Sequence, residues 1–215
     1  PPFDKILPEH FMPAFERGMS LHEAEIDAIT SNKDEATFEN TILAYDDAGQ
    51  MLAQTELVFG MLCAAETNDR MQALQEQAMP LLAAHRDKIR LDDKLFVRVK
   101  EVYDRRAALG LDAEQMRLLQ KTYDSFVRAG ALLDAEQKAR LKEINGQLSL
   151  TAVKFGNNIL AENNNFVLEL KSDELDGLPA GIRDAAREKA QQMGKGDKWV
   201  SVSYTHLTLP TNSRV

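Results

Sequence analysis

Apolar residues recur at helical spacing along most of the chain, up to about Asn163. Pro8 and Pro13 fit the opening of a first helix, because proline is tolerated in a first turn and disrupts a helix interior. Thr37 is predicted to cap a second helix through its hydroxyl oxygen. The apolar residues on these two helices are Phe11, Phe15, Met19, Leu21, Ile26 and Ile29 in the first, and Phe38, Ile42, Tyr45, Leu52 and Val58 in the second.

Two further helices follow in the same pattern. The third is predicted from Asn68 to Arg90, with a kink at Pro80, where the ring removes a backbone hydrogen bond. A fourth helix is predicted to start at Asp92 or Asp93, since an aspartate side chain satisfies free backbone N–H groups at a helix start.

The tetrapeptide DAEQ occurs twice, at Asp112–Gln115 and at Asp134–Gln137, each time before an apolar-periodic stretch. Aspartate followed three residues later by glutamine is typical of a capping box, so two more helix starts are predicted. The stretches that follow share no further pattern, which argues against a repeat architecture. The second stretch has an apolar stripe, predicted to be core or a surface for a partner helix, at Leu141, Ile144, Leu148, Phe155 and Ile159.

After Asn163 the period changes from helical to alternating. Phe166–Lys171 reads as a short strand, and a turn around Gly177 leads into a last helix at about Pro179–Met193. Lys198–Val200 begins a second strand that is a natural partner for the first. The predicted fold is mainly α with a small β hairpin-like appendage near the C-terminus, divided into a helical region 1–164 and a strand–turn–helix–strand region 165–200.

Composition narrows the possible partners and location. The chain of 215 residues carries a net charge of −8, which disfavours binding to nucleic acid. The longest apolar run, Leu57–Ala65, is far shorter than the roughly 18 residues needed to cross a membrane, so no membrane partner is expected. Cys63 lies within this run and reads as a buried small hydrophobe in a reducing, cytoplasmic compartment. Because the chain starts at Pro1, its true N-terminus is expected to lie upstream, and an exported location stays open.

No catalytic, cofactor-binding or metal-ligating residue is predicted in this chain. His22 begins HEAEI, which resembles the zinc-binding H-E-x-x-H helix, but Ile26 stands where the second histidine ligand is needed. A solvated helix surface is therefore the favoured interpretation of His22, with a metal site formed with nearby acids as a weaker alternative. His10 and His85 are expected in ordinary surface or capping roles.

Three other patterns have structural interpretations. The acidic stretch Ser172–Asp176 lacks the ligand spacing of a calcium loop and is expected to be a solvated turn. Met51, Met61 and Met71 fall at regular intervals and are expected to fill gaps in the core. No glycine-rich phosphate loop or nucleophile elbow occurs in the sequence.

Four residue strings resemble one enzyme family. They are PPFDKILPEHFMPAFERGM (1–19), EIDAI (25–29), ATFENTILAYDDAGQML (36–52) and NFVLELKSDELDGLP (165–179). In this order they are similar to the N-terminal part of the thimet oligopeptidase family of zinc metallopeptidases, in its peptidyl-dipeptidase and oligopeptidase A branch. The resemblance extends from Pro1 to about Val200.

The resemblance implies a large two-lobed helical enzyme with a deep channel that admits short peptides. In that family an H-E-x-x-H helix and a downstream glutamate hold one zinc ion, and the motif glutamate acts as general base. All these residues belong to a C-terminal catalytic half, so none is carried over to a position in this chain. The chain is expected to form part of the channel wall, inactive alone. The alternative is a free-standing helical interaction module that presents the stripe from Leu141 to Ile159 to a partner.

The last residues depart from the family pattern at about Ser201. Val202–Thr211 reads VSYTHLTLPT, which is the translation of a DNA sequence that resembles a transposon-end adapter used for sequencing libraries. Residues 201–215 are therefore predicted to be a non-native tail, in which His206 has no function.

Overall fold

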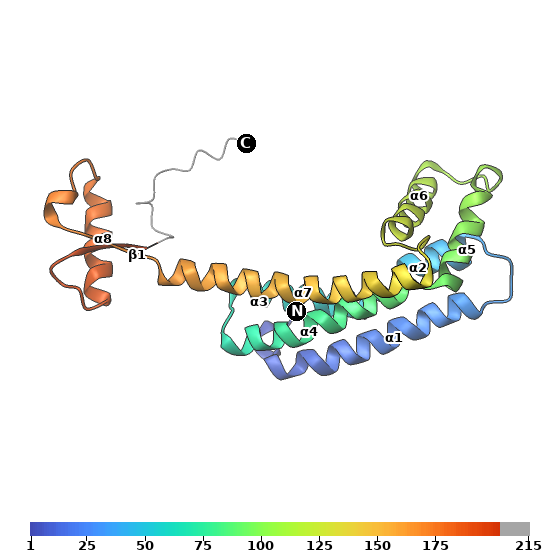
Figure 1. Cartoon of the computed structure of the whole chain (residues 1–215), viewed down its shortest axis with the longest axis horizontal. Coiled ribbons are helices and arrows are strands. Elements are labelled where there is room, and N and C mark those ends of the chain that lie inside the picture. Colours follow the sequence, from blue (N-terminus) through green and yellow to red (C-terminus); the bar gives the residue numbers. More distant parts are fainter. Residues whose placement is uncertain (203–215) are drawn as a thin grey trace. The chain divides into compact units, whose positions relative to one another are not determined.

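The computed structural model describes residues 1–202, and most of them are helical (Figure 1). This confirms the predicted fold class, mainly α with a small antiparallel sheet. The helices are α1 (Phe11–Ser31), α2 (Ala44–Asp47), α3 (Gln50–Ala65), α4 (Asp69–Arg90), α5 (Asp93–Asp104), α6 (Ala113–Arg128), α7 (Ala135–Asn165) and α8 (Ala180–Gln192), and the strands are β1 (Val167–Leu170) and β2 (Trp199–Val202).

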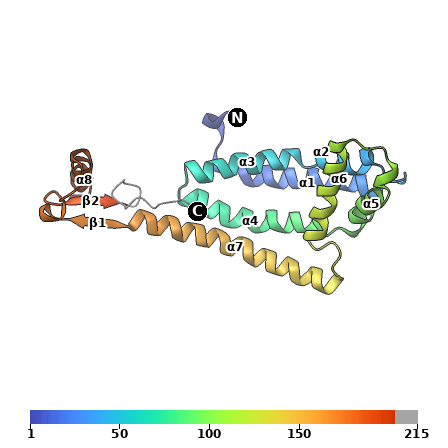
Figure 2. The ribbon, with the colours of Figure 1, turned by 90° about the horizontal axis from the view of Figure 1, so that it is seen from above.

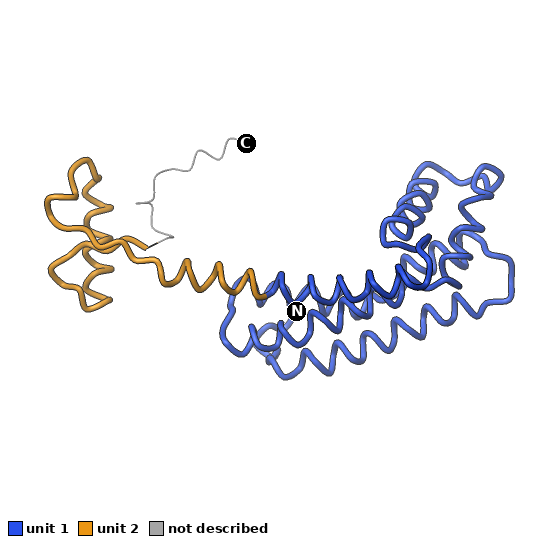
Figure 3. The backbone as a smooth tube through the Cα atoms, in the orientation of Figure 1, with its two compact units in different colours: residues 1–153 blue, residues 154–215 orange. Residues whose placement is uncertain are grey.

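The chain divides into two compact units after Val153, a position inside α7 (Figure 3). Unit 1 begins at Pro1 and contains α1 to α6 with the first part of α7, and unit 2 contains the rest of α7, the sheet and α8. The division after residue 164 that the change of period suggests stays a prediction. None of the helices among residues 1–202 combines the length and apolar composition needed to cross a bilayer.

The predicted helix starts in unit 1 are confirmed by their hydrogen bonds. The Asp112 carboxylate accepts from the Gln115 backbone N–H at 2.9 Å, and the Gln115 side chain accepts from the Asp112 N–H at 3.1 Å. Asp134 and Gln137 make the same reciprocal pair at 2.8 and 3.2 Å. Asp92, and not its neighbour, caps α5 by accepting from the Leu95 N–H at 2.8 Å. Each cap satisfies backbone donors that the first turn leaves free.

The prediction of one helix that is capped by Thr37 and carries Phe38 to Val58 is wrong. Thr37 does cap a helical segment, a π-helical turn at Phe38–Leu43 that continues into α2, but the chain then turns at Gly49 before α3 begins. Gly49 has φ +77°, a left-handed conformation that favours glycine. Its backbone N–H donates to the Glu25 carboxylate of α1 at 2.7 Å, so a contact distant in sequence fixes this corner.

The core of unit 1 consists of two apolar clusters. In one, α1, α3 and α4 lie side by side (Figure 2), and the rings of Phe15 and Phe59 meet edge to face with centroids 5.3 Å apart. The other joins the C-terminal half of α1 to α5 and α6. Their buried members are Phe11, Phe15, Leu52, Phe59, Met71, Ala78 and Leu82 in the first cluster, and Ile26, Ile29, Ala36, Phe38, Ile42, Ile89, Leu95, Phe96, Val99, Val102, Leu119, Phe126 and Ala131 in the second.

Unit 2 contains the two strands that the sequence predicts, paired antiparallel with Val167 opposite Val202 and Leu170 opposite Trp199. Helix α8 packs against β2, where Ala190, Val200 and Val202 form a small buried cluster. Strand β2 therefore includes the first two residues of the predicted non-native tail. Residues 203–215, with His206, lie outside the described residues, and the origin of the tail stays a prediction.

Candidate functional site

His22 lies beside His85, and this pair is the main side-chain cluster that the sequence did not predict. His22 Nδ1 on α1 lies 3.0 Å from His85 Nε2 on α4, within hydrogen-bonding distance, and the ring centroids are 5.0 Å apart. The His85 side chain is buried, with 5% of the residue exposed. The expectation of a surface or capping role for His85 is therefore wrong, because the packing of α1 on α4 covers its ring. His22 is partly buried, so it keeps some contact with solvent but also has a partner, His85, that the sequence did not predict.

Charged side chains surround the histidine pair. His85 Nδ1 lies 3.5 Å from a carboxylate oxygen of Glu23 without the angles of a hydrogen bond, so this contact is electrostatic. The other carboxylate oxygen of Glu23 accepts from Lys88 Nζ at 2.8 Å. Glu23 is paired with Lys88, so it is not a free carboxylate that would hold the two imidazoles in the charged form.

Burial sets the protonation of the pair. Desolvation lowers the pKa of both His22 and His85 below the ordinary value of 6.5, and for His22 the neighbouring His85 lowers it further. Carboxylates act in the opposite direction on both rings, but more weakly than burial. The hydrogen bond from Lys88 lowers the pKa of Glu23. At neutral pH the pair is therefore uncharged, and one ring donates its N–H to the other.

The histidine pair does not form a metal site of ordinary composition. Zinc sites in proteins use three or four histidine, cysteine or carboxylate ligands. Within residues 1–202, no group of three or more such side chains is placed to hold a metal ion. Glu25, whose charge acts on His22, already accepts a hydrogen bond from the Gly49 N–H.

His10 and Cys63 have structural roles. His10 Nδ1 accepts from the Leu7 backbone N–H at 3.2 Å, where the chain enters a short 3-10 helix at Pro8–His10, so its predicted capping role is confirmed. The Cys63 thiol is partly buried, and burial raises its pKa, which disfavours the reactive thiolate. Neither residue joins the histidine pair.

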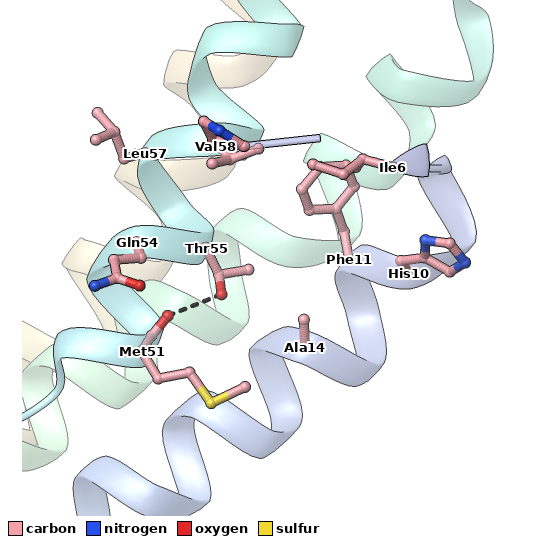
Figure 4. Close-up of a pocket in the computed structure, with 10 residues that line it drawn as sticks. Ile6, His10, Phe11, Ala14, Met51, Gln54, Thr55, Leu57 and Val58 are labelled. Atoms are coloured by element: carbon pink, nitrogen blue, oxygen red, sulfur yellow. Dashed lines mark hydrogen bonds between the residues drawn. The ribbon is translucent and has the colours of Figure 1, made fainter. Parts of the chain in front are cut away.

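An open, mostly apolar pocket of about 540 Å³ lies between the N-terminal segment, α1 and α3 (Figure 4). Apolar side chains from two stretches distant in sequence, 1–14 and 51–58, line it, among them Ile6, Phe11 and Val58. The Thr55 hydroxyl in its wall donates its hydrogen to the Met51 carbonyl at 2.8 Å, so towards a ligand it offers only an acceptor oxygen (Figure 4). The pocket fits an apolar group and offers no acid–base pair. Sequence analysis missed it because no local pattern joins its walls.

Helix α7 exposes apolar side chains along the predicted stripe. Ile144, Leu148, Phe155 and Ile159 are 43%, 62%, 65% and 47% exposed, respectively. Within residues 1–202, the one side chain of α7 that is buried is Val153. These four residues are therefore not core residues within residues 1–202. Of the two predicted roles, core or a surface for a partner helix, the second remains.

The methionines are only partly core residues. Met71 is 4% exposed and belongs to the apolar cluster of α1, α3 and α4, as expected. Met51 and Met61 are 41% and 51% exposed, and Met51 lines the open pocket between α1 and α3 instead of filling a gap in the core (Figure 4). The core prediction for these two is wrong, and regular spacing alone does not identify a buried face.

Comparison with known proteins identifies the family. No protein-family model matches the chain. It is 38% identical over 201 residues to dipeptidyl carboxypeptidase of Escherichia coli (strain K12), a match that covers 93% of this chain and 30% of that protein. The corresponding protein of Salmonella typhimurium is 36% identical over 200 residues, with 93% and 29% covered. Oligopeptidase A of Escherichia coli (strain K12) is 23% identical over 192 residues, with 89% and 28% covered.

These matches agree with the resemblance of the four sequence strings. They extend over nearly all of this chain, and the chain spans about 30% of the length of the relatives that it matches. A thimet-like oligopeptidase of Dictyostelium discoideum matches over the same extent, 94% of this chain and 29% of that protein. The chain belongs to the thimet oligopeptidase family, in the branch of dipeptidyl carboxypeptidase and oligopeptidase A.

Proposed function

We propose that this chain is the helical, non-catalytic N-terminal part of a zinc-dependent oligopeptidase or peptidyl-dipeptidase that hydrolyses short peptides. The observation that carries the proposal is the extent of the matches, which cover 93% of this chain but only 30% and 29% of the two dipeptidyl carboxypeptidases. A protein of that length has room outside this segment for the residues that bind zinc and cleave the peptide.

The histidines of the chain support a non-catalytic role. None of the four is followed by the sequence E-x-x-H, so the sequence lacks the zinc-binding helix. Of the two that meet in space, His85 is buried and His22 is held by His85 at 3.0 Å. Zinc in the complete protein would supply the activation of water for peptide hydrolysis, and residues outside this chain would hold it.

We assign to these helices the role of scaffold and of one wall of the peptide channel. Two apolar surfaces support this role, the exposed side of α7 and the pocket between the N-terminal segment, α1 and α3. A longer protein would cover these surfaces or present them to peptides. A single, partly buried cysteine fits a reducing compartment, so we place the complete protein in the cytoplasm.

A chimera tests the scaffold role. The segment of E. coli dipeptidyl carboxypeptidase that matches this chain is replaced by residues 1–200, and hydrolysis of a short peptide is measured. The proposal predicts a folded chimera with activity, and a matched chimera carrying Gly49→Ala should be less stable because it disturbs the α2–α3 corner. A chimera that folds to the stability of the parent and cleaves nothing would count against the proposed role.

The flanking genomic sequence separates this proposal from a free-standing interaction module. A reading frame that continues into an H-E-x-x-H codon run supports an oligopeptidase. A genuine stop codon directly after Val215 refutes it and favours the module.

A further inference from the structure

The histidine pair connects three parts of unit 1. It joins α1 to α4 through the 3.0 Å contact between His22 Nδ1 and His85 Nε2. The His22 ring also lies against the corner between α2 and α3, so closely that a Cβ atom on Gly49 would stand 2.8 Å from its Nδ1. Glu25, one turn further along α1, accepts the Gly49 N–H at 2.7 Å. One helix face therefore holds both the corner and, through His85, helix α4.

The number of protons on the pair decides whether this contact can exist. With two neutral rings, one nitrogen donates its proton and the other accepts it. With one ring protonated, the shared position still holds a single proton and the hydrogen bond remains. With both rings protonated, two N–H groups face each other at 3.0 Å and two positive charges meet in a partly buried site.

The charged groups around the pair do not compensate a second proton. Glu23 is nearest to His85 but is hydrogen-bonded to Lys88 at 2.8 Å, which brings a positive charge to the same place. The groups that face the pair are Glu23 and Glu25 from α1, Lys88 from α4 and Glu56 from α3, the last of which lies 3.5 Å from Arg86. Each of these carboxylates already has a donor of its own.

We propose that the His22–His85 pair is a pH-sensitive contact that holds α1, α4 and the Gly49 corner together at neutral pH and loosens when both imidazoles are protonated on acidification. This is independent of the proposed peptidase function, since it uses contacts inside unit 1 alone.

The direction of the pH effect follows from burial. Both histidines have a pKa below the ordinary 6.5 in the folded chain, so the unfolded chain binds more protons as the pH falls below 6.5. The contribution of the pair to folding stability is fully present above pH 6.5. It is lost as the pH falls from 6.5 through the pKa values of the two histidines in the folded chain. For each proton that folding excludes, the ratio of unfolded to folded protein rises by up to about tenfold per pH unit.

Urea unfolding of the full chain at pH values from 8 to 5 tests the proposal. The variant His85→Gln keeps an N–H donor beside His22 but cannot be protonated, and His10→Gln is the matched control outside the pair. Between pH 7 and pH 5 the unfolded-to-folded ratio of the wild type should rise on the order of tenfold more than that of His85→Gln. His10→Gln should behave as the wild type. Equal pH dependence in wild type and His85→Gln would overturn the proposal.

A measurement on the wild type needs no substitution and covers the case that His85→Gln does not fold. The imidazole resonances of His22 and His85 and the backbone amide of Gly49 are followed by NMR during acidification. The proposal predicts that both rings titrate below pH 6.5 and that the Gly49 amide shifts together with them. Titration of the two rings at 6.5 with an unchanged Gly49 amide would contradict it.

Discussion

Replacing Gly49 with alanine should destabilise unit 1 by about 2–5 kcal/mol. Two costs add up at this position. The left-handed backbone at φ +77° costs a residue with a Cβ atom about 1–2 kcal/mol. The new Cβ would stand 2.8 Å from His22 Nδ1, and forcing extra volume into a packed site costs about 1–3 kcal/mol.

The assay is urea unfolding at pH 7.5, followed by far-ultraviolet circular dichroism. Gly60→Ala is the matched control, because Gly60 lies inside α3 and an added Cβ meets nothing within 4 Å. Alanine is favoured over glycine in a helix interior by about 0.8–1 kcal/mol, so the control should be more stable than the wild type. The same chemical change thus has opposite signs at two positions eleven residues apart in sequence.

Two results would refute this reasoning. One is a Gly49→Ala variant as stable as the wild type. This would mean that the left-handed backbone at residue 49 and the close contact with the His22 ring are not required by the fold. The other is a Gly60→Ala variant that is destabilised as much as Gly49→Ala, which would mean that the added methyl group acts through something other than local geometry.

Three further predictions concern other contacts. Asp112→Ala should lower the free energy of unfolding by about 1 kcal/mol through loss of the α6 cap, whereas Asp112→Asn, an equally good cap, should be near neutral, as measured by urea unfolding. The purified chain should self-associate through exposed α7 side chains, and Leu148→Gln with Phe155→Gln should shift sedimentation toward the monomer; a monodisperse wild-type monomer would contradict this. Hydrogen bonds from two lysines lower the pKa of Glu169 from 4.5 to about 2, so its contribution to stability is present above pH 4.5 and is lost as the pH falls toward 2. Glu169→Gln should lack this loss when the unfolding of unit 2 is followed by Trp199 fluorescence.

Local signals predicted much of the fold. The two DAEQ capping boxes, the Asn68 start of α4 and the β1–β2 pairing were predictable because each depends on residues within a few positions or on a simple change of period. Helix α4 continues through Pro80 over the predicted range, and the kink at Pro80 stays a prediction. The helical class of the chain followed from these signals alone.

The missed features all depend on contacts distant in sequence. His22 and His85 are 63 residues apart, and no spacing rule connects them. The corner at Gly49 is fixed by Glu25 and by the His22 ring, both on α1. The apolar pattern continues on both sides of the corner, so it predicted one helix where the structure has two. The exposure of Met51 and Met61 depends on which side of α3 meets its neighbours, and a helix with apolar residues on several sides does not reveal that side.

Hydrolysis of a short peptide by the purified chain alone tests the central claim most directly. The rate is measured with and without added zinc and with and without a chelator, using E. coli dipeptidyl carboxypeptidase as the positive control, and bound zinc is quantified in the same samples. A non-catalytic part of an oligopeptidase should show no chelator-sensitive cleavage and no stoichiometric zinc, while the control cleaves. Cleavage that increases with the concentration of this chain and is abolished by the chelator would contradict the account.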